Sequence, residues 1–408
     1  MSIIGESKLG VDYLTVESSF GSVKGFINKD YPNVAQFLGI RFAEPPTGPR
    51  RWLPPVAKAP ADHIDATEFD VPELRIKDGT SEDCLSLCIY VPEKAAKDPK
   101  SAKLPVIVWI TGGAFLVGGN TIPYQNPTPW VNRSQRHIVV SINYRLTIFG
   151  FPNAAGLPPH ERNLGFLDQR LGLEWVHKHI ASFGGDPSRL THFGQSAGGR
   201  SIDIHTFLYP DNPLVRNIIL HSGTTLPRLP VHDPEHTYFS FVAKSLGFEG
   251  KDAQAELEFM RQQPVEKLID FIENHFYTKT APFLAFRPVV DNFTLFDDYE
   301  ERAIAGKFSK LPAIIGTMND EGNSVAPYNP DGVDVAASEK ITKGYFLGPA
   351  VKIARVSEGW QDLYVAFAED GPDGLRKLGW NDLSSGEGIV LGRGEKGWEL
   401  VKLEEIDN

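Results

Sequence analysis

The sequence predicts an α/β fold with a mostly parallel central sheet and helices on both faces. Short, mainly apolar runs occur at residues 104–110, 138–142, 189–193, 215–220 and 312–315. Runs of this length that are rich in Val and Ile are typical of strands covered on both faces. Helical patterns lie between the runs, most clearly at residues 163–181. Such alternation favours a parallel sheet with flanking helices.

Length and charge limit the classes of protein that fit this chain. It has 408 residues and a formal net charge of −11. We expect no nucleic-acid partner, because binding to phosphates needs basic patches. We find no internal repeat and no convincing linker. We therefore expect a single domain over residues 1–408, with a helical excursion at about 230–310.

The two cysteines and the N-terminus bear on the cellular compartment. Cys84 and Cys88 are four residues apart in an expected strand. Four residues of strand span roughly 13 Å, which is too far for a disulfide. Two free thiols favour a reducing compartment. No apolar run has the length of a signal peptide or of a membrane span. We therefore expect a cytoplasmic protein without a membrane span.

A G-x-S-x-G pattern, Gly194-Gln-Ser-Ala-Gly198, follows the run at 189–193. In one interpretation it is a sharp strand-to-helix turn that exposes the hydroxyl of Ser196 and aims the amide of Ala197 at a reacting carbonyl oxygen. The alternative is an ordinary glycine-rich turn. The strand pattern before it and the helix-compatible stretch after it favour a nucleophile.

Two other strand ends carry residues suited to the same chemistry. Gly112-Gly113-Ala114-Phe115 follows the run at 104–110, and its amides lack bulky neighbours. Such amides can converge on a developing oxyanion, although a tight structural turn has the same pattern. Glu321 follows the run at 312–315. An acid there would orient a histidine, and the alternative is a solvated turn.

These segments and further motifs together resemble the carboxylesterase/lipase family, which includes the cholinesterases and many fungal esterases. The resemblance covers about residues 15–360, and its motifs occur in the order of the family. The further motifs are Phe37-Leu-Gly-Ile-Arg-Phe-Ala-Glu-Pro-Pro, Ser81-Glu-Asp-Cys-Leu-Ser-Leu, Asn143-Tyr-Arg-Leu-Thr-Ile-Phe-Gly-Phe, Asn163-Leu-Gly-Phe-Leu-Asp-Gln-Arg and Phe183-Gly-Gly-Asp-Pro.

The resemblance implies an α/β-hydrolase fold and a serine esterase that forms an acyl-enzyme on a small-molecule ester, with no cofactor and no metal. By resemblance Ser196 is the nucleophile, Gly113, Ala114 and Ala197 supply the oxyanion-hole amides, and Glu321 is the acid of the triad. Residues 70–83 contain no aromatic side chain, so choline esters are not favoured as substrates.

One element of the family is absent from its place. The fold needs a histidine after the acid, but no histidine follows Glu321 and the last is His275. Residues 346–355 and 361–370 resemble the helices that flank the final strand and histidine loop, and they meet at Gly359-Trp360. We infer that this C-terminal strand and histidine loop are deleted, either in the protein itself or through a mispredicted exon boundary. His221, at the end of an expected strand, is the best substitute base, and its alternative role is structural support of the turn.

Three functional hypotheses follow. The first is a serine carboxylic ester hydrolase whose activity is limited by the missing base. The second is a catalytically inactive relative that acts as a binding protein, and the absent histidine motivates it. The third is a lactonase or dehydrating cyclase of small-molecule biosynthesis on the same scaffold.

Overall fold

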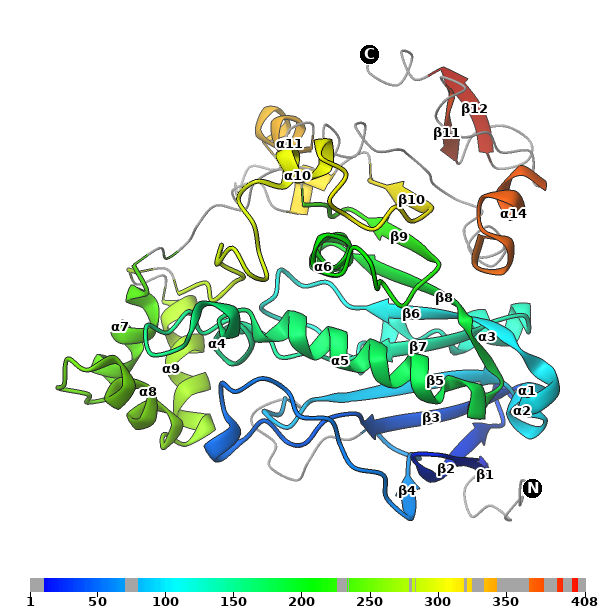
Figure 1. Ribbon diagram of the computed structural model, residues 1–408, viewed down its shortest axis with the longest axis horizontal. Coiled ribbons are helices and arrows are strands. Elements are labelled where there is room, and N and C mark those ends of the chain that lie inside the picture. The colour runs from blue at the N-terminus through cyan, green and yellow to red at the C-terminus, as the bar shows by residue number, and fades with distance from the viewer. Residues whose placement is uncertain are drawn as a thin grey trace.

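A mixed sheet forms the centre of the molecule (Figure 1). The computed structural model describes residues 11–69, 80–225, 233, 235–278, 281–282, 284–318, 321–324, 334–342, 367–377, 387–391 and 398–402. Within these residues the sheet has 10 strands in the order β1-β2-β3-β5-β7-β6-β8-β9-β10, with β4 paired to β2. Helices lie on both faces, which confirms the predicted α/β class.

The expected parallel strands make up one half of this sheet. They are β7 (Ile138–Ile142), β6 (Leu104–Ile110), β8 (Gly185–Gln195), β9 (Asn217–His221) and β10 (Ala313–Gly316). Each pairs in parallel with the next. Their carboxyl ends therefore lie along one edge, where α/β sheets place their binding sites. In the described part of the chain the sheet ends at β10.

The other half of the sheet is antiparallel and comes mainly from the N-terminal part of the chain. It contains β1 (Val11–Ser18), β2 (Gly21–Asn28), β3 (Val34–Arg41) and β5 (Ser86–Pro92), together with the short β4 (His63–Asp65). Strand β5 joins the two halves by pairing antiparallel with β7. The sheet is therefore mixed: apart from the parallel pairing of the short β4 with β2, its parallel strands lie in the half that carries the nucleophile motif.

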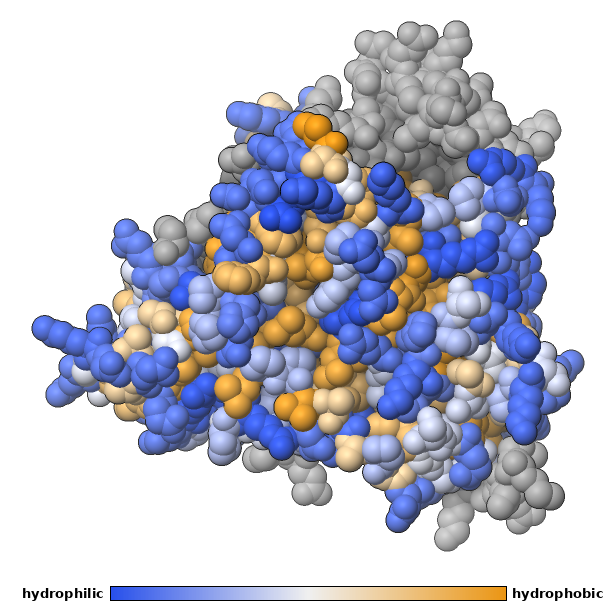
Figure 2. All heavy atoms as spheres, in the orientation of Figure 1, coloured by the Kyte–Doolittle hydropathy of each residue, from blue (hydrophilic) through white to orange (hydrophobic). Residues whose placement is uncertain are grey.

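Two cores fill the space between the sheet and its helices. On one face, α5 (Leu164–His179) and α6 (Ala197–Leu208) pack against side chains such as Ile110 and Leu220. On the other face, Phe193 and Ile219 pack with Val131 of α3 (Thr128–Ser134). In the view of Figure 2, polar side chains dominate the surface and apolar ones appear between them near α5 and α6. Scattered exposed apolar side chains are usual in soluble proteins.

The remaining helices are short. They are α1 (Glu93–Lys97), α2 (Pro99–Ala102), α4 (Thr147–Gly150), α10 (Tyr299–Ile304), α11 (Val335–Ile341) and α14 (Pro372–Lys377). A separate hairpin pairs β11 (Glu387–Leu391) with β12 (Trp398–Lys402). The junction at Gly359-Trp360 lies outside the described residues, so the deletion stays a prediction.

Three helices form a lobe with its own apolar cluster: α7 (Thr237–Ser245), α8 (Ala253–Arg261) and α9 (Val265–Tyr277). Within the expected helical excursion at about 230–310, α8 ends at Arg261 and α9 begins at Val265. Pro264 lies at this break, and proline within a helix removes a backbone hydrogen bond. The single-domain assignment stays a prediction.

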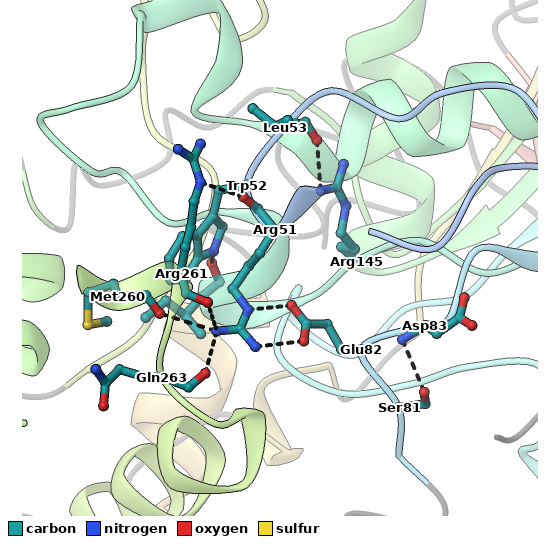
Figure 3. A network of polar contacts seen from close by, with 11 residues as sticks. Arg51, Trp52, Leu53, Ser81, Glu82, Asp83, Arg145, Met260, Arg261 and Gln263 are labelled. Carbon is teal, nitrogen blue, oxygen red and sulfur yellow. Dashed lines mark hydrogen bonds and ion pairs between the residues drawn. The ribbon is translucent and has the colours of Figure 1, made fainter. Parts of the chain in front are cut away.

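Arg51 ties this lobe to the rest of the molecule (Figure 3). Its Nε and Nη2 atoms donate to the two carboxylate oxygens of Glu82 at 2.5 and 2.9 Å. Its Nη1 atom donates to the carbonyl oxygens of Met260, Arg261 and Gln263 at 3.2, 3.2 and 2.7 Å. A cation at the C-terminal end of α8 also complements the helix dipole. Arg51 therefore connects the segment that contains Glu82 to the helical lobe through a buried, charge-assisted contact.

The cysteines are both free, as expected. Cys88 is buried within β5, and Cys84 lies two residues before that strand. Burial raises the pKa of the Cys84 thiol to about 12, so the thiol is neutral and unreactive at physiological pH.

Among the helices of the described ranges, none combines the length and the apolar character needed to cross a membrane.

Candidate active site

Ser196 occupies a sharp turn between β8 and α6. Its φ of 54° and ψ of −119° place a non-glycine residue in a backbone region that is strained for it. Strain of this kind persists only where surrounding contacts hold it, and it is frequent at functional sites. The Ser196 amide donates to the carbonyl oxygen of His221 at 2.7 Å, and the Arg200 amide donates to the Ser196 carbonyl oxygen at 2.9 Å. These bonds hold both sides of the turn.

The glycines of the G-x-S-x-G motif are required by close backbone contacts. A Cβ atom on Gly194 would lie 2.5 Å from the carbonyl carbon of Gly198. A Cβ atom on Gly198 would lie 2.1 Å from the carbonyl oxygen of Ile110 in β6. Larger residues would push α6 away from the sheet. The structure therefore gives a steric reason for the pattern, and the turn has the geometry of a nucleophile elbow.

The loop after β6 packs directly against this turn. A Cβ atom on Gly112 would lie 2.6 Å from the Gln195 carbonyl oxygen and 3.2 Å from the Ser196 Cβ atom. The next two residues have positive φ angles, 114° for Gly113 and 57° for Ala114. Gly112 therefore lies beside Ser196, and Gly113 and Ala114 continue the loop from it.

Three amides near the hydroxyl remain available as donors. Within the ranges that the structure describes, the amides of Gly113, Ala114 and Ala197 donate no hydrogen bond. Ser196 itself is only partly buried, whereas Ala197 is 5% exposed. Unpaired backbone donors beside an accessible hydroxyl are the arrangement that stabilises an oxyanion in acyl transfer.

Glu321 begins a 3₁₀ turn, Glu321–Ser324, five residues beyond the end of β10. Its Oε1 atom accepts hydrogen bonds from the Met318 amide at 2.9 Å and from the Thr317 hydroxyl at 3.1 Å. In the strand register, Gly316 pairs with His221, and His221 pairs with Gln195. Glu321 therefore follows a strand that ends at the same edge as the Ser196 turn, two strands away. Its role as the acid stays a prediction.

His221 is the last residue of β9, as the sequence indicated. Its ring packs edge-on against Phe193 at 5.0 Å between centroids. Burial lowers the pKa of His221 to about 4, so the imidazole is neutral at pH 7 and a weak base. Its backbone carbonyl accepts a hydrogen bond from the Ser196 amide and so supports the turn. A structural role is thus visible, and the role of substitute base stays a prediction.

Other histidines near the turn are buried behind it. His192 and His205 are 2% and 6% exposed, and their ring centroids are 6.0 Å apart. His205 Nε2 bonds to Gln169 Oε1 at 3.0 Å. Burial lowers the pKa of His192 to about 3 and that of His205 well below its usual value. Both are therefore neutral packing residues in the layer between the sheet, α5 and α6.

Two aromatic side chains, one in β6 and one in the loop after it, make packing contacts. Phe115 is 3% exposed and packs against Phe151 and Phe166. Trp109 contacts Phe193 and donates to Gln125 at 3.2 Å. No group of three or more metal-ligating side chains occurs among the residues with a described placement.

One contact that supports the turn could not be predicted from the sequence. Gly223, in the segment after β9, lies so close that a Cβ atom would be 2.0 Å from the Ser196 carbonyl oxygen. The only signal was the small residue in His221-Ser222-Gly223, directly after an expected strand. Small residues after a strand are common in turns, so the close approach could not be inferred without the fold.

Known proteins resemble this chain over most of its length. The family model described as carboxylesterase family matches residues 12–354. Secreted lipase 5 of Gibberella zeae is 35% identical, over 90% of this chain and 87% of the lipase. Chlorogenic acid esterase of Aspergillus niger is 40% identical, over 74% of this chain and 62% of that enzyme. Acetylcholinesterase of Bungarus fasciatus is 32% identical, over 82% of this chain and 57% of that enzyme.

Solved structures show the same fold. A thermophilic PNB esterase superposes with a TM-score of 0.68 at 28% identity, covering 83% of this chain and 76% of that chain. A second PNB esterase has a TM-score of 0.75 at 24% identity and covers 96% of this chain and 98% of that chain. The matching family model and the 35% identity to the lipase show that the chain belongs to the carboxylesterase family.

Proposed function

We propose that this protein is a serine carboxylic ester hydrolase that acts through an acyl-enzyme on Ser196. One observation carries the proposal: the strained turn at Ser196 lies against a loop whose Gly113 and Ala114 amides, like the amide of Ala197, donate no hydrogen bond to any residue that the structure describes. The Ser196 oxygen attacks the ester carbonyl carbon and its proton goes to a base. The three amides stabilise the oxyanion, the alcohol leaves, and water then releases the acid.

The lack of a strong base limits the rate of this reaction. The sequence has no histidine after Glu321, and the imidazole of His221 is a weak base. In one serine protease, loss of the histidine lowers turnover by about 10⁶, while oxyanion stabilisation and binding retain about 10³ over water. We therefore expect Ser196-dependent but slow hydrolysis, with Glu321 as the acid that would orient a base.

The substrate class follows from the side chains around the site and from relatives. Val117, just beyond the amide-bearing residues, is 67% exposed, and Met318, three residues before Glu321, is 54% exposed. These apolar side chains favour a small-molecule ester with an apolar acyl or alcohol group. Relatives named as a lipase and a chlorogenic acid esterase are consistent with ester substrates.

Labelling with a fluorophosphonate tests the nucleophile directly, because the probe reacts with an activated serine hydroxyl. We expect covalent labelling of the wild-type protein at Ser196 and none of Ser196→Ala. The same pair is then compared for hydrolysis of p-nitrophenyl butyrate. Equal labelling of both proteins would remove Ser196 from the mechanism.

A catalytically inactive binding protein is the alternative, and the missing histidine favours it. This alternative requires that p-nitrophenyl esters are not turned over even at high protein concentration. Hydrolysis that disappears in Ser196→Ala would exclude it.

We also propose a cytoplasmic location, on the support of two free thiols. The relative named as a secreted lipase argues for the alternative. Fractionation of the producing cells and their medium decides between the two, because recovery from the medium would contradict a cytoplasmic location.

A further inference from the structure

The segment after β9 runs alongside α6, behind the Ser196 turn. The Arg200 Nε atom donates to the Thr224 carbonyl oxygen at 2.6 Å. Asp203 Oδ2 accepts from the Thr225 amide at 2.6 Å and from the Thr225 hydroxyl at 2.8 Å. Two successive residues of the segment are thus held by two charged side chains of the helix.

The contacts follow the helix in order. Gly223 lies against the carbonyl of Ser196, and the next two residues contact Arg200 and Asp203. Positions 196, 200 and 203 have the spacing of one helix face. The segment 223–225 therefore runs along a single stripe of α6 that starts at the nucleophile.

The charged pair is placed where charges are costly. Thr224 and Thr225 are 7% and 5% exposed. Burial raises the pKa of Asp203, against the lowering effect of the hydrogen bonds from Thr225 and the charge of Arg200. A partly buried carboxylate destabilises a fold unless its hydrogen bonds compensate. Neither residue belongs to the G-x-S-x-G motif, so the turn itself does not require them.

The segment and the amide-bearing loop flank the nucleophile from opposite sides. Strand β8, which leads to Ser196, lies between β6 and β9 in the sheet. Residues 112–114 follow β6, and residues 222–225 follow β9. The segment 222–225 therefore lies on the side of the Ser196 turn away from residues 112–114.

We propose that Arg200 and Asp203 are positioning residues, which hold residues 223–225 as the wall of the Ser196 site opposite residues 112–114 and so set the size of the acyl group that the site accepts. The inference rests on the proposed function, because it concerns the acyl group of that reaction. Neither residue touches the substrate. Loosening the wall changes selectivity between acyl chains, whereas a general loss of stability would lower all rates together.

Asp203→Ala tests this inference, with Asp186→Ala as its matched control. Asp186 accepts from the Ser188 amide and hydroxyl at 2.9 and 2.7 Å, which is the same pair of contacts in a turn at the start of β8. Hydrogen exchange of peptides covering residues 222–225 reports on the wall. Fluorophosphonates with short and long alkyl chains report on the selectivity of Ser196 without requiring turnover.

We expect Asp203→Ala to speed exchange of the Thr225 amide and to change the ratio of long-chain to short-chain labelling by at least about fivefold, the factor for losing one hydrogen bond. Asp203→Asn keeps an acceptor oxygen and should restore both values. Asp186→Ala should change neither. Unchanged exchange in Asp203→Ala, or an equal loss of labelling for all chains, would overturn the inference. A wild-type protein that no probe labels contradicts the proposed function instead.

Discussion

The amide of Ser196 donates a 2.7 Å hydrogen bond to the carbonyl oxygen of His221, so the last residue of β9 holds the turn that carries the candidate nucleophile. In the strand register His221 pairs with Gln195, so this bond extends the β8–β9 ladder by one residue beyond β8. The bond satisfies a backbone donor in a strained turn. The shape of the turn therefore depends on β9, which lies on the opposite side of β8 from the amide-bearing loop.

Gly223→Ala should disturb this coupling. The added Cβ atom would lie 2.0 Å from the Ser196 carbonyl oxygen, so either the segment after β9 or the turn must move. We expect fluorophosphonate labelling of Ser196 to slow by at least about tenfold, because small displacements of reacting groups have large effects on rate. Labelling rates and the melting temperature are measured together.

The control is Gly247→Ala, in the loop after α7. A Cβ atom there meets nothing within 4 Å, but the φ of 104° strains any side chain. This variant should lower stability by about 1 kcal/mol without changing the labelling rate. A Gly223→Ala protein that is labelled at the wild-type rate would show that the segment does not support the turn.

The parallel half of the sheet was predictable because its signals are local. The run at residues 138–142 coincides with β7, and the glycines around Ser196 mark the turn where the structure has it. The bounds of other strands depend on contacts between residues that are distant in the sequence. Strand β8 extends back to Gly185, which pairs with Leu104, and residues 186–189 between Gly185 and Leu190 interrupt the register with β6.

Only the parts of the site that carry a sequence motif were predictable. The sequence placed the Ser196 turn and the Gly113 loop at strand ends, and the sheet order brings these two together. It could not indicate that Asp203 bonds to Thr225, because this pair depends on how α6 lies against the segment after β9. Such contacts between elements have no pattern in a single sequence.

Glu82→Gln should strongly destabilise the protein. The variant keeps the size of the side chain but leaves the charge of Arg51 without its partner, and the Arg51 and Glu82 side chains are each only 5% exposed. Removing one partner of a buried ion pair costs about 3–5 kcal/mol. Urea unfolding gives the change in the free energy of unfolding.

Asp298→Asn serves as the control for this prediction. Asp298 pairs with Arg302 at 2.5 Å, but the two side chains are 44% and 27% exposed. Loss of an exposed pair costs at most about 1 kcal/mol. Equal effects of the two substitutions would mean that the contact of Arg51 with the helical lobe adds little.

Stability should fall as the pH drops from about 6.5 toward 4. Burial lowers the pKa of His137 and His192 to about 3, below the value of 6.5 for an unburied histidine. Below pH 6.5 the unfolded chain therefore binds protons that the folded protein does not, and unfolding is favoured. Each such histidine contributes a slope of about 1.4 kcal/mol per pH unit in this range.

His192→Asn isolates one of these contributions. The free energy of unfolding, measured in urea from pH 7 to pH 4.5, should depend less on pH in this variant by about the slope of one histidine. His177→Asn, which replaces an exposed histidine of α5, is the control for the substitution itself. An unchanged slope in His192→Asn would mean that His192 is protonated in the folded protein.

Imidazole in solution should accelerate ester hydrolysis by this protein. The proposed mechanism lacks a strong base near Ser196, since no histidine follows Glu321 in the sequence and burial lowers the pKa of His221 to about 4. A free imidazole that enters the site would take the proton from the Ser196 hydroxyl, and Glu321 would orient it. Hydrolysis of p-nitrophenyl butyrate is followed at rising imidazole concentration, and the rate with Ser196→Ala is subtracted because imidazole also cleaves the ester by itself. We expect the remaining rate to rise with imidazole in the wild-type protein, and to rise less in Glu321→Gln because its amide orients the base less well.

A corrected rate that does not change with imidazole would mean that the protein already has a base, or that Ser196 takes no part in the reaction. Labelling of Ser196 by the fluorophosphonate distinguishes these two cases.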